Sequence, residues 1–176
     1  RVSEPAALAD ASKVILPGVG SFDAMVRKLD AAGFRQPILE HGRQGKHLLG
    51  ICLGMQLLSA GSEEGKLAGL GLIPGRVRRF SFKGDLAHLK VPHMGWNQVK
   101  LVHQHPLGRG LEADARFYFV HSYYFDCESE GDVLFRTSYG LDFASGVQRD
   151  TVMGVQFHPE KSHRFGLQLI KNFVEL

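Results

Sequence analysis

Residues 50–54 decide the fold, and they read Gly-Ile-Cys-Leu-Gly. They follow an apolar run, 47–51, that is typical of a buried strand, and they precede a run, 55–59, that begins a helix. The two glycines let the backbone turn sharply, so the thiol of Cys52 projects from the end of the strand. This pattern is the cysteine form of the nucleophile elbow, and the following helix N-terminus favours a thiolate. A buried structural cysteine between packing glycines is the alternative interpretation.

A strand and two helices are predicted before this elbow. The apolar run 14–16 is closed by Pro-Gly-Val-Gly at 17–20, and apolar residues at helical spacing then cover 22–32. A second helix is predicted for 37–44. Because a strand, a long crossover and a strand in this order favour parallel pairing, we expect a parallel βαβ unit whose sheet is covered on both faces.

The second half of the sequence changes character. Its predicted strands are short, β-rich and separated by Gly, Asp or Pro; they cover 76–82, 96–102, 117–125, 133–138, 144–148 and 152–157. Apolar residues at helical spacing between Phe165 and Phe173 predict a final amphipathic helix. The fold class is therefore α/β, with a central, mostly parallel sheet flanked by helices and with additional antiparallel strands that resemble a meander.

Length and composition bound what the chain can be. Its 176 residues fit one domain, 1–176, and 44% hydrophobic with 22% charged residues is an ordinary globular composition. Lys plus Arg number 21 against 18 Asp plus Glu, so the net charge is +3; without a long basic run this is weak evidence for a nucleic-acid partner. The densest basic stretch, Arg76, Arg78 and Arg79, is better explained as one face of an edge strand.

Cysteine usage points to a cytoplasmic protein. Cys52 and Cys127 are too few for a disulfide framework, and we find neither a charged leader nor an apolar run of about 20 residues. We therefore expect free thiols, no membrane association and a packing role for Cys127. We expect no metal and no cofactor, and the Gly-rich turn at 17–20 lacks the spacing of a dinucleotide site.

A catalytic thiol needs a base, and His158 is the candidate among nine histidines. It ends the apolar strand 153–157, and Glu160 follows two residues later, so both lie at the C-terminal end of a predicted parallel strand, where sites form in open α/β sheets. His158 can take the Cys52 proton and pass it to the leaving amine, while Glu160 can orient the imidazole. A core or capping role is the alternative. Five other histidines carry no pattern and are expected on the surface or in incidental positions: His41, His47, His88, His103 and His105.

Acyl chemistry also needs an oxyanion hole, with donors aimed where negative charge develops. The N–H of Leu53, directly after the nucleophile, is one natural donor. The turn at 17–20 ends a neighbouring strand and can bring a second, which we assign to Val19. Taken alone, this segment is equally well explained as an ordinary turn.

Five segments carry a family resemblance: Leu-Pro-Gly-Val-Gly-Ser-Phe (16–22), Gly-Ile-Cys-Leu-Gly-Met-Gln (50–56), Val-Pro-His-Met-Gly-Trp-Asn (91–97), Tyr-Phe-Val-His-Ser-Tyr (118–123) and Gly-Val-Gln-Phe-His-Pro-Glu-Lys-Ser (154–162). From about residue 13 to the end, the sequence resembles the glutaminase subunit of imidazole glycerol phosphate synthase. The cysteine and His-Pro-Glu motifs are common to class I glutamine amidotransferases, which implies their flavodoxin-like fold; 92–97 is far more specific to this subunit. The family has an additional N-terminal strand and helix that we do not find in this sequence.

The resemblance also implies roles for residues outside the triad. Five would bind L-glutamine, with the charge of Glu64 suited to the α-ammonium group: Gly20, Gln56, Glu64, Ser122 and Tyr123. Five would face a (β/α)8-barrel cyclase subunit in a heterodimer: His93, Trp96, Asn97, Tyr118 and Lys161. A single Trp is often simply buried, so core packing is the alternative for Trp96.

For function, the resemblance implies hydrolysis of glutamine to glutamate and ammonia by the triad. Ammonia would pass through the cyclase barrel and yield imidazole glycerol phosphate in histidine biosynthesis. One alternative changes the acceptor, since 139–143 and 162–166 resemble a branch that supplies ammonia for amidination of surface-polysaccharide sugars. The others are a stand-alone cysteine hydrolase on the same fold, which 92–97 argues against, and a non-catalytic scaffold subunit, which the complete triad argues against.

Overall fold

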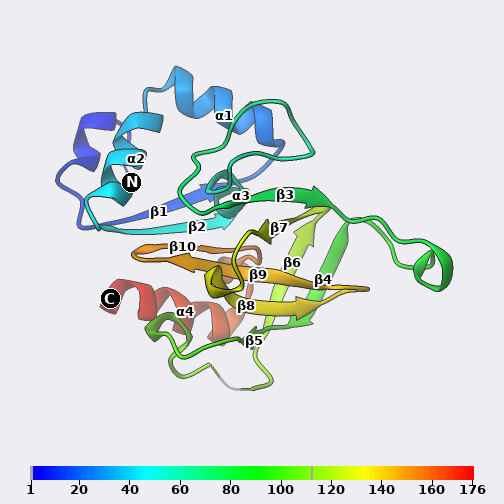
Figure 1. The fold of residues 1–176 in the computed structure, drawn as a ribbon. Coiled ribbons are helices and arrows are strands. Elements are labelled where there is room, and N and C mark those ends of the chain that lie inside the picture. The colour runs from blue at the N-terminus through cyan, green and yellow to red at the C-terminus, as the bar shows by residue number, and fades with distance from the viewer. Residues whose placement is uncertain (1, 112) are drawn as a thin grey trace.

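The computed structural model describes residues 2–111 and 113–176, which form a mixed sheet with helices on both sides (Figure 1). The strands are β1 (Lys13–Gly18), β2 (His47–Cys52), β3 (Gly75–Arg79), β4 (His93–Gln98), β5 (Lys100–Leu101), β6 (Arg116–His121), β7 (Tyr123–Cys127), β8 (Val133–Ser138), β9 (Asp142–Arg149) and β10 (Val152–Val155). The α-helices are α1 (Phe22–Ala31), α2 (Arg35–Arg43), α3 (Leu53–Leu57) and α4 (His163–Glu175). Short 3₁₀ helices are η1 (Pro5–Leu8), η2 (Gly84–Leu86), η3 (Pro106–Gly108), η4 (Glu130–Asp132) and η5 (Pro159–Lys161).

Strands β1, β2 and β10 form the parallel part of the sheet. The sheet order is β1-β2-β10-β9-β7-β3, and β2 pairs in parallel with both β1 and β10. The β1–α1–α2–β2 segment is the expected βαβ unit. Its register aligns Gly18 with Cys52, and Val155 of β10 is aligned with Ile51, so the C-terminal ends of the three strands meet at one edge. The parallel part is smaller than expected, because β9 lies antiparallel beside β10.

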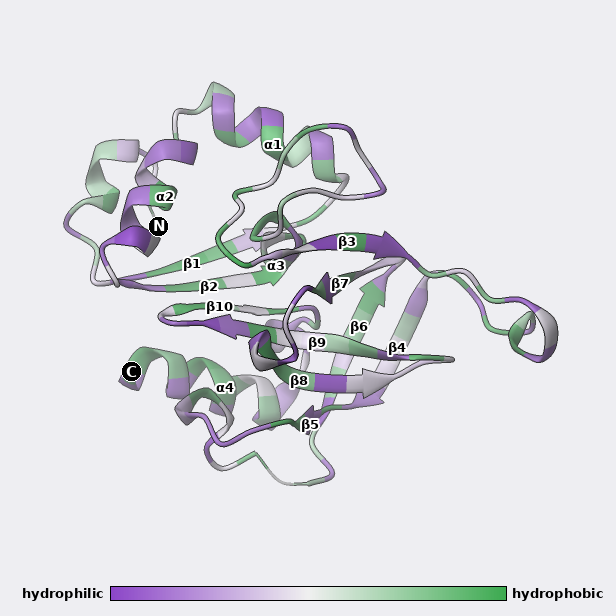
Figure 2. Cartoon of the chain, in the orientation of Figure 1, coloured by the Kyte–Doolittle hydropathy of each residue, from purple (hydrophilic) through white to green (hydrophobic). Residues whose placement is uncertain are grey.

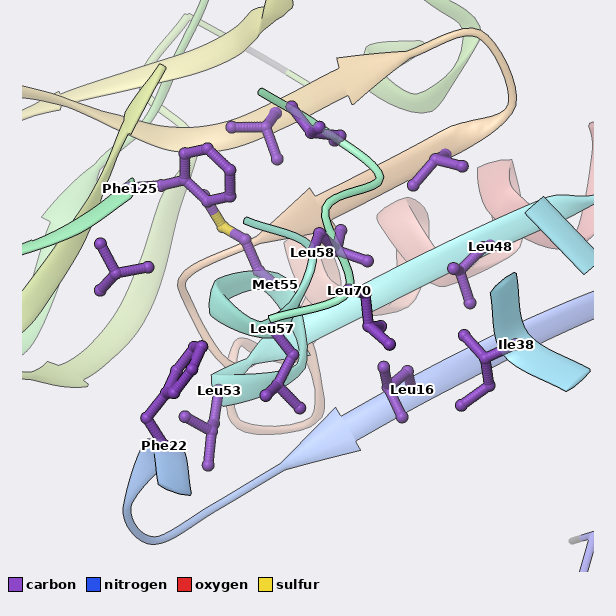
Figure 3. Packing of buried hydrophobic residues seen from close by; sticks show 14 of the residues in the cluster. Leu16, Phe22, Ile38, Leu48, Leu53, Met55, Leu57, Leu58, Leu70 and Phe125 are labelled. Atoms are coloured by element: carbon purple, nitrogen blue, oxygen red, sulfur yellow. The ribbon is translucent and has the colours of Figure 1, made fainter. Parts of the chain in front are cut away.

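Helices cover both faces of these strands, as expected: α1 and α2 lie on one side and α4 on the other (Figure 1). The consecutive residues Leu48 and Leu49 are both fully buried but belong to different cores, because successive side chains of a strand point to opposite faces. The first core includes Leu16, Phe22, Ile38, Leu48, Met55 and Leu70, and Figure 3 shows them packed between the strands and the helices. Figure 2 shows the largely hydrophobic colouring of β2, the mixed colouring of the amphipathic helix α4 and the mainly hydrophilic edge strand β3.

The second core lies under α4 and contains many aromatic residues, including Phe117, Phe119, Phe135, Phe157 and Phe173. Phe157 is fully buried, and its ring centroid lies 4.0 Å from that of Phe117. Burying one such side chain stabilises a fold by about 1.5–3 kcal/mol. The backbone at Phe157, which leads directly into the next residue, is therefore anchored by the core beneath it.

The antiparallel strands differ in detail from the predicted ones. The predicted strand 117–125 is divided at Ser122 into β6, which pairs with β4 in a separate two-stranded sheet, and β7, which pairs with β3. The predicted strand 96–102 is likewise divided between β4 and β5. The edge-strand interpretation of the basic stretch agrees with the position of β3 at the end of the sheet order, where Arg78 forms an ion pair with Asp126.

Gly54 in α3 lies directly against β1, and a methyl group there has no room. A Cβ atom at this position would lie 1.8 Å from the carbonyl oxygen of Leu16, which belongs to a strand held by its pairing with β2. We expect Gly54→Ala to lower the free energy of unfolding by at least about 3 kcal/mol, measured by urea denaturation. The control is Gly131→Ala, whose added Cβ would approach only the Ser129 hydroxyl, at 3.4 Å. Equal losses for the two variants would contradict this reading of the α3–β1 contact.

Candidate active site

Cys52 lies where β2 ends and α3 begins. Its backbone has φ 54° and ψ −111°, and a positive φ is strained for a residue with a side chain. The neighbouring glycines make the turn possible, since a Cβ at Gly50 would lie 2.6 Å from the carbonyl oxygen of Gly54. This is the sharp strand-to-helix turn that the Gly-Ile-Cys-Leu-Gly sequence indicates.

Burial dominates the electrostatics of the Cys52 thiol. Desolvation raises its pKa to about 11, and the Glu160 carboxylate also raises it. The Leu53 N–H lowers the pKa by more than Glu160 raises it, and Lys161 and the Gln156 amide lower it by less than Glu160 raises it. The helix start does favour a thiolate, since the Leu53 N–H lowers the pKa, but burial of the sulfur outweighs this effect. The resting protein therefore carries a thiol, and a base must remove its proton during any reaction.

His158 lies three residues after the end of β10, and its backbone N–H donates to the carbonyl of Tyr118 (2.9 Å). Its Nδ1 lies 2.7 Å from Glu160 Oε1, so Nδ1 carries the hydrogen and Nε2 of the neutral ring keeps a lone pair. Nε2 is buried and has no hydrogen-bond partner among the described residues. A buried nitrogen with a free lone pair is suited to take a proton from a neighbouring group.

A cavity of about 380 Å³ lies at the C-terminal edge of β2 and β10, within the size range of small-molecule sites. Cys52 and His158 both line it, as do Val19 and Leu53, the predicted oxyanion donors. The other lining residues are Gly20, Gln56, Glu64, Pro92, Val120, His121, Ser122, Tyr123 and Lys161. The structure thus brings every residue predicted to bind glutamine to one cavity. Glu160 lies behind it, in contact with His158.

Two of these side chains are held by hydrogen bonds. Glu64 Oε2 accepts from the N–H of Phe22 at the start of α1 (2.8 Å), which leaves its other oxygen for the cavity. Gln56 donates from Nε2 to the Tyr123 carbonyl (3.1 Å) and to the Gln156 side-chain oxygen (2.9 Å). Because both amide hydrogens are used, only Oε1 of Gln56 is left to interact with a ligand.

Sequence reasoning does not single out two residues of this site, Gln156 and His121. The Gln156 Nε2 lies 3.8 Å from Cys52 Sγ, and its side chain is fully buried. His121 lines the cavity, and its Nδ1 lies 2.7 Å from the Tyr123 carbonyl oxygen. In the sequence, each is a polar residue within an otherwise apolar strand, inside a segment that carries the family resemblance: 118–123 for His121 and 154–162 for Gln156.

Residues predicted to face a partner lie on β4, β6 and η5. Trp96 is 47% exposed, so core packing does not describe it. Its ring stacks on His163, with ring centroids 5.3 Å apart and 1° between the planes. The Lys161 ammonium lies 5.7 Å from the ring centroid of Tyr118. The side chains of Trp96, Tyr118 and Lys161 form one surface patch beside the cavity, together with the exposed Met94. We call this patch the β4–β6 surface.

Two histidines differ from expectation. His93, expected to face a partner, is only 3% exposed and lies with Nδ1 2.9 Å from His121 Nε2, because alternation along β4 turns it inward. Asn97, on the same face of β4, is partly exposed. His41, expected at a surface or incidental position, is also buried, and its Nε2 lies 3.0 Å from the carbonyl oxygen of His47.

Cys127 is partly buried and packs against the first core, in agreement with the packing role expected of it. In the part of the chain that the structure describes, no group of three or more His, Cys, Asp or Glu side chains is placed to hold a metal ion. Nor does any described helix have the length and apolar character needed to cross a membrane.

The chain matches known proteins over nearly its whole length. The model of the family "Glutamine amidotransferase class-I" matches residues 3–176. Imidazole glycerol phosphate synthase subunit HisH of Bdellovibrio bacteriovorus is 50% identical over 96% of this chain and 83% of its own length. Imidazole glycerol phosphate synthase subunit HisH 2 of Pseudomonas aeruginosa is 49% identical over 94% of this chain and 81% of its own length.

A crystal structure of a glutamine amidotransferase resembles the fold, with a TM-score of 0.73 at 22% identity over 99% of this chain and 83% of that one. At this identity the likeness concerns the fold alone, and it agrees with the fold class predicted from the sequence. The family model and the close relatives confirm the resemblance seen in the motifs. The chain belongs to the class I glutamine amidotransferase family and, within it, to the family of imidazole glycerol phosphate synthase subunit HisH.

Proposed function

We propose that this chain is the glutaminase subunit of an imidazole glycerol phosphate synthase and hydrolyses L-glutamine to glutamate and ammonia with Cys52, His158 and Glu160. The observation that carries the proposal is that a nucleophile elbow and an imidazole with a free Nε2 line one cavity. Relatives named as HisH, which align with most of the chain, support the choice of synthase. We also propose a cytoplasmic location, in keeping with the free thiols.

Glutamine binding and attack follow from the groups around the cavity. The α-ammonium group of glutamine lies toward Glu64, and its side-chain amide carbon lies against the sulfur of Cys52. His158 Nε2 takes the thiol proton as the sulfur attacks this carbon. The N–H groups of Leu53 and Val19 then donate to the oxygen that becomes negative in the tetrahedral intermediate.

The second half of the reaction returns the proton. His158 donates it to the amide nitrogen, the C–N bond breaks, ammonia leaves, and a glutamyl thioester remains on Cys52. His158 next takes a proton from water, which attacks the thioester; glutamate leaves and the thiol is restored. Glu160 accepts from Nδ1 throughout and stabilises the imidazolium that forms in each half-reaction.

Ammonia must reach its acceptor before water protonates it, so the site should open toward a partner and not toward solvent. Lys161 of the β4–β6 surface lines the cavity, and so does Pro92, which directly precedes β4. That surface exposes the large side chains of Met94 (61%) and Trp96 (47%), as interfaces do. We propose that a (β/α)8-barrel cyclase subunit binds here as a heterodimer and uses the ammonia to make imidazole glycerol phosphate for histidine biosynthesis.

Glu160→Gln is expected to slow glutamine hydrolysis by about ten- to a hundredfold. This is less than the roughly ten-thousandfold drop in kcat that follows when a buried triad carboxylate is replaced by an amide. The reason is that the Glu160 side chain is 57% exposed, so water replaces part of its stabilisation of the imidazolium. Steady-state glutaminase rates, measured with saturating glutamine in the presence of the partner, provide the test. Full activity in the Gln variant would make Glu160 a structural residue and reduce the triad to a dyad.

Covalent labelling tests the proposed chemistry itself. A chloroketone analogue of glutamine should label Cys52 and spare Cys127, and added glutamine should slow the labelling. Equal labelling of both cysteines without protection by glutamine would favour a general cysteine hydrolase. Co-purification from cells should then identify the partner, and recovery of a sugar amidotransferase in place of a cyclase would redirect the proposal to surface-polysaccharide synthesis.

A further inference from the structure

A chain of buried hydrogen bonds begins on β4 and runs inward. Asn97 Nδ2 lies 3.2 Å from His93 Nε2, and His93 Nδ1 lies 2.9 Å from His121 Nε2. His121 Nδ1 in turn lies 2.7 Å from the carbonyl oxygen of Tyr123. His93 and His121 are 3% and 5% exposed, so water does not compete for these contacts.

The chain continues from the same carbonyl to the nucleophile. The Tyr123 oxygen also accepts from Gln56 Nε2 (3.1 Å), which donates in addition to Gln156 Oε1 (2.9 Å). The Nε2 of Gln156 lies 3.8 Å from Cys52 Sγ. Gln56 and Gln156 are 5% and 0% exposed. Six residues from four segments of the chain thus connect β4 to the reacting sulfur.

Each link on the histidine side has only one possible direction. The Tyr123 carbonyl can only accept, so His121 carries its hydrogen on Nδ1 and accepts at Nε2. His93 must then donate from Nδ1 and accept at Nε2, where the Asn97 amide group is the donor. Desolvation lowers the pKa of His121 to about 3 and that of His93 to about 4, in agreement with two neutral rings. The second amide hydrogen of Asn97 is directed to the Ser138 carbonyl (3.0 Å).

The glutamine side of the chain is fixed in the same way. Gln56 spends both amide hydrogens on the Tyr123 carbonyl and Gln156, so Gln156 must present its oxygen to Gln56 and its NH2 group to Cys52. The opposite orientation would bring two NH2 groups to 2.9 Å and turn a carbonyl oxygen toward the sulfur. The 3.8 Å contact with sulfur is too weak to set this orientation, so the hydrogen bonds behind it do.

We propose that Gln156 is a catalytic hydrogen-bond donor to the Cys52 sulfur, that Gln56 and the Tyr123 carbonyl set its amide in the donating orientation, and that His121, His93 and Asn97 hold this carbonyl in place. A hydrogen bond to sulfur strengthens as the thiol becomes a thiolate, so it favours the charged form. His93 and Asn97 lie on the face of β4 opposite Met94 and Trp96, so the chain begins on the inner face of this strand. This inference rests on the proposed function only for its role in turnover, since thiolate formation is measurable without glutamine or a partner.

Alkylation of Cys52 by iodoacetamide at one fixed pH tests the proposal in the full chain carrying Cys127→Ala, where Cys52 is the only thiol. Gln156→Leu is expected to slow alkylation about tenfold, because a hydrogen bond to a charged group is lost. His93→Leu should slow it about threefold, because His121 then loses the donor at its Nε2 and holds the Tyr123 carbonyl, and through it Gln56 and Gln156, less firmly. His93→Asn places an amide nitrogen near the position of Nδ1, and it is expected to restore the rate to within about twofold.

Thr137→Val is the matched control. Thr137 donates a buried hydrogen bond to Ser145 Oγ (2.8 Å) that is not part of the chain to Cys52, so its loss lowers stability without changing the alkylation rate. If His93→Leu does not fold, Asn97→Leu at the partly exposed end of the chain replaces it, with the same expected effect.

Three outcomes decide the matter. Slower alkylation in Gln156→Leu, together with the His93→Asn rescue, supports both the donor and its positioning. Parent-like rates in Gln156→Leu and His93→Leu would overturn the inference. Equal rates in His93→Leu and His93→Asn would overturn the positioning role. A chain that does not hydrolyse glutamine would refute the proposed function but would leave these rates as they are, so the two failures are distinguishable.

Discussion

Cys52→Ala is expected to abolish glutamine-dependent synthesis by the reconstituted complex while leaving synthesis from added ammonium salts unchanged. Loss of the nucleophile in a catalytic triad lowers kcat by about a millionfold, and Cys52 takes part only in making ammonia, not in using it. The substitution removes one sulfur atom from a residue that is 8% exposed, so the fold should persist. Product formation measured with each nitrogen source provides the test.

The control is Cys127→Ala, which should keep both activities within a few-fold. Cys127 is partly buried against the first core and lies outside the cavity. Its own pKa is raised to about 12 by burial, so it is a poor nucleophile in the folded chain. Equal loss of both activities in Cys52→Ala would show that Cys52 is needed for the structure of the complex and would argue against separate ammonia production.

The sequence predicts the parallel part of the fold because its signals are local. An apolar run, a glycine turn and a helical period each depend on neighbouring residues, and together they lead to β1, β2 and the elbow at Cys52. The division at Ser122 has no such signal, since the alternating, aromatic-rich pattern continues from β6 into β7. What separates these strands is the pairing of β6 with β4 and of β7 with β3, across 17 and 43 intervening residues.

The candidate site shows the same limit at the level of side chains. Motifs indicate Cys52, His158 and Glu160, because the chemistry of a thiol, a base and an orienting acid restricts which residues can serve. They do not indicate Gln156, whose importance depends on which end of its amide faces the sulfur. That orientation is set by Gln56 and the Tyr123 carbonyl, from two other segments. The prediction that His93 faces a partner is wrong for a related reason, because its position in the motif does not indicate which face of β4 it occupies.

The isolated chain is expected to hydrolyse glutamine slowly and to be activated about a hundred- to thousandfold by the proposed cyclase partner. This factor is the effect on kcat of one oxyanion donor, about 2.7–4 kcal/mol. The structural reason lies in the turn after β1. Val19 is 79% exposed, and Gly20 has φ +95° with no atom within 4 Å of where a Cβ would be. Because glycine stands on both sides of Val19, the backbone of this turn can change conformation at low cost and turn the Val19 N–H toward or away from the cavity.

Only the end of the turn has this freedom, because β1 is paired with β2 as far as Gly18, opposite Cys52. A partner bound on the β4–β6 surface lies beside the same cavity. It can favour the conformation in which the Val19 N–H points into the cavity, and more strongly when the partner holds its own ligand. Steady-state glutaminase rates of the chain alone, with the partner, and with the liganded partner measure the effect. Leu53 provides its N–H in both conformations of the turn, so only the Val19 donor is gained on activation. The activation should therefore appear in kcat and should not exceed the effect of one oxyanion donor. A chain equally fast alone would rule out this switch and favour an independent hydrolase.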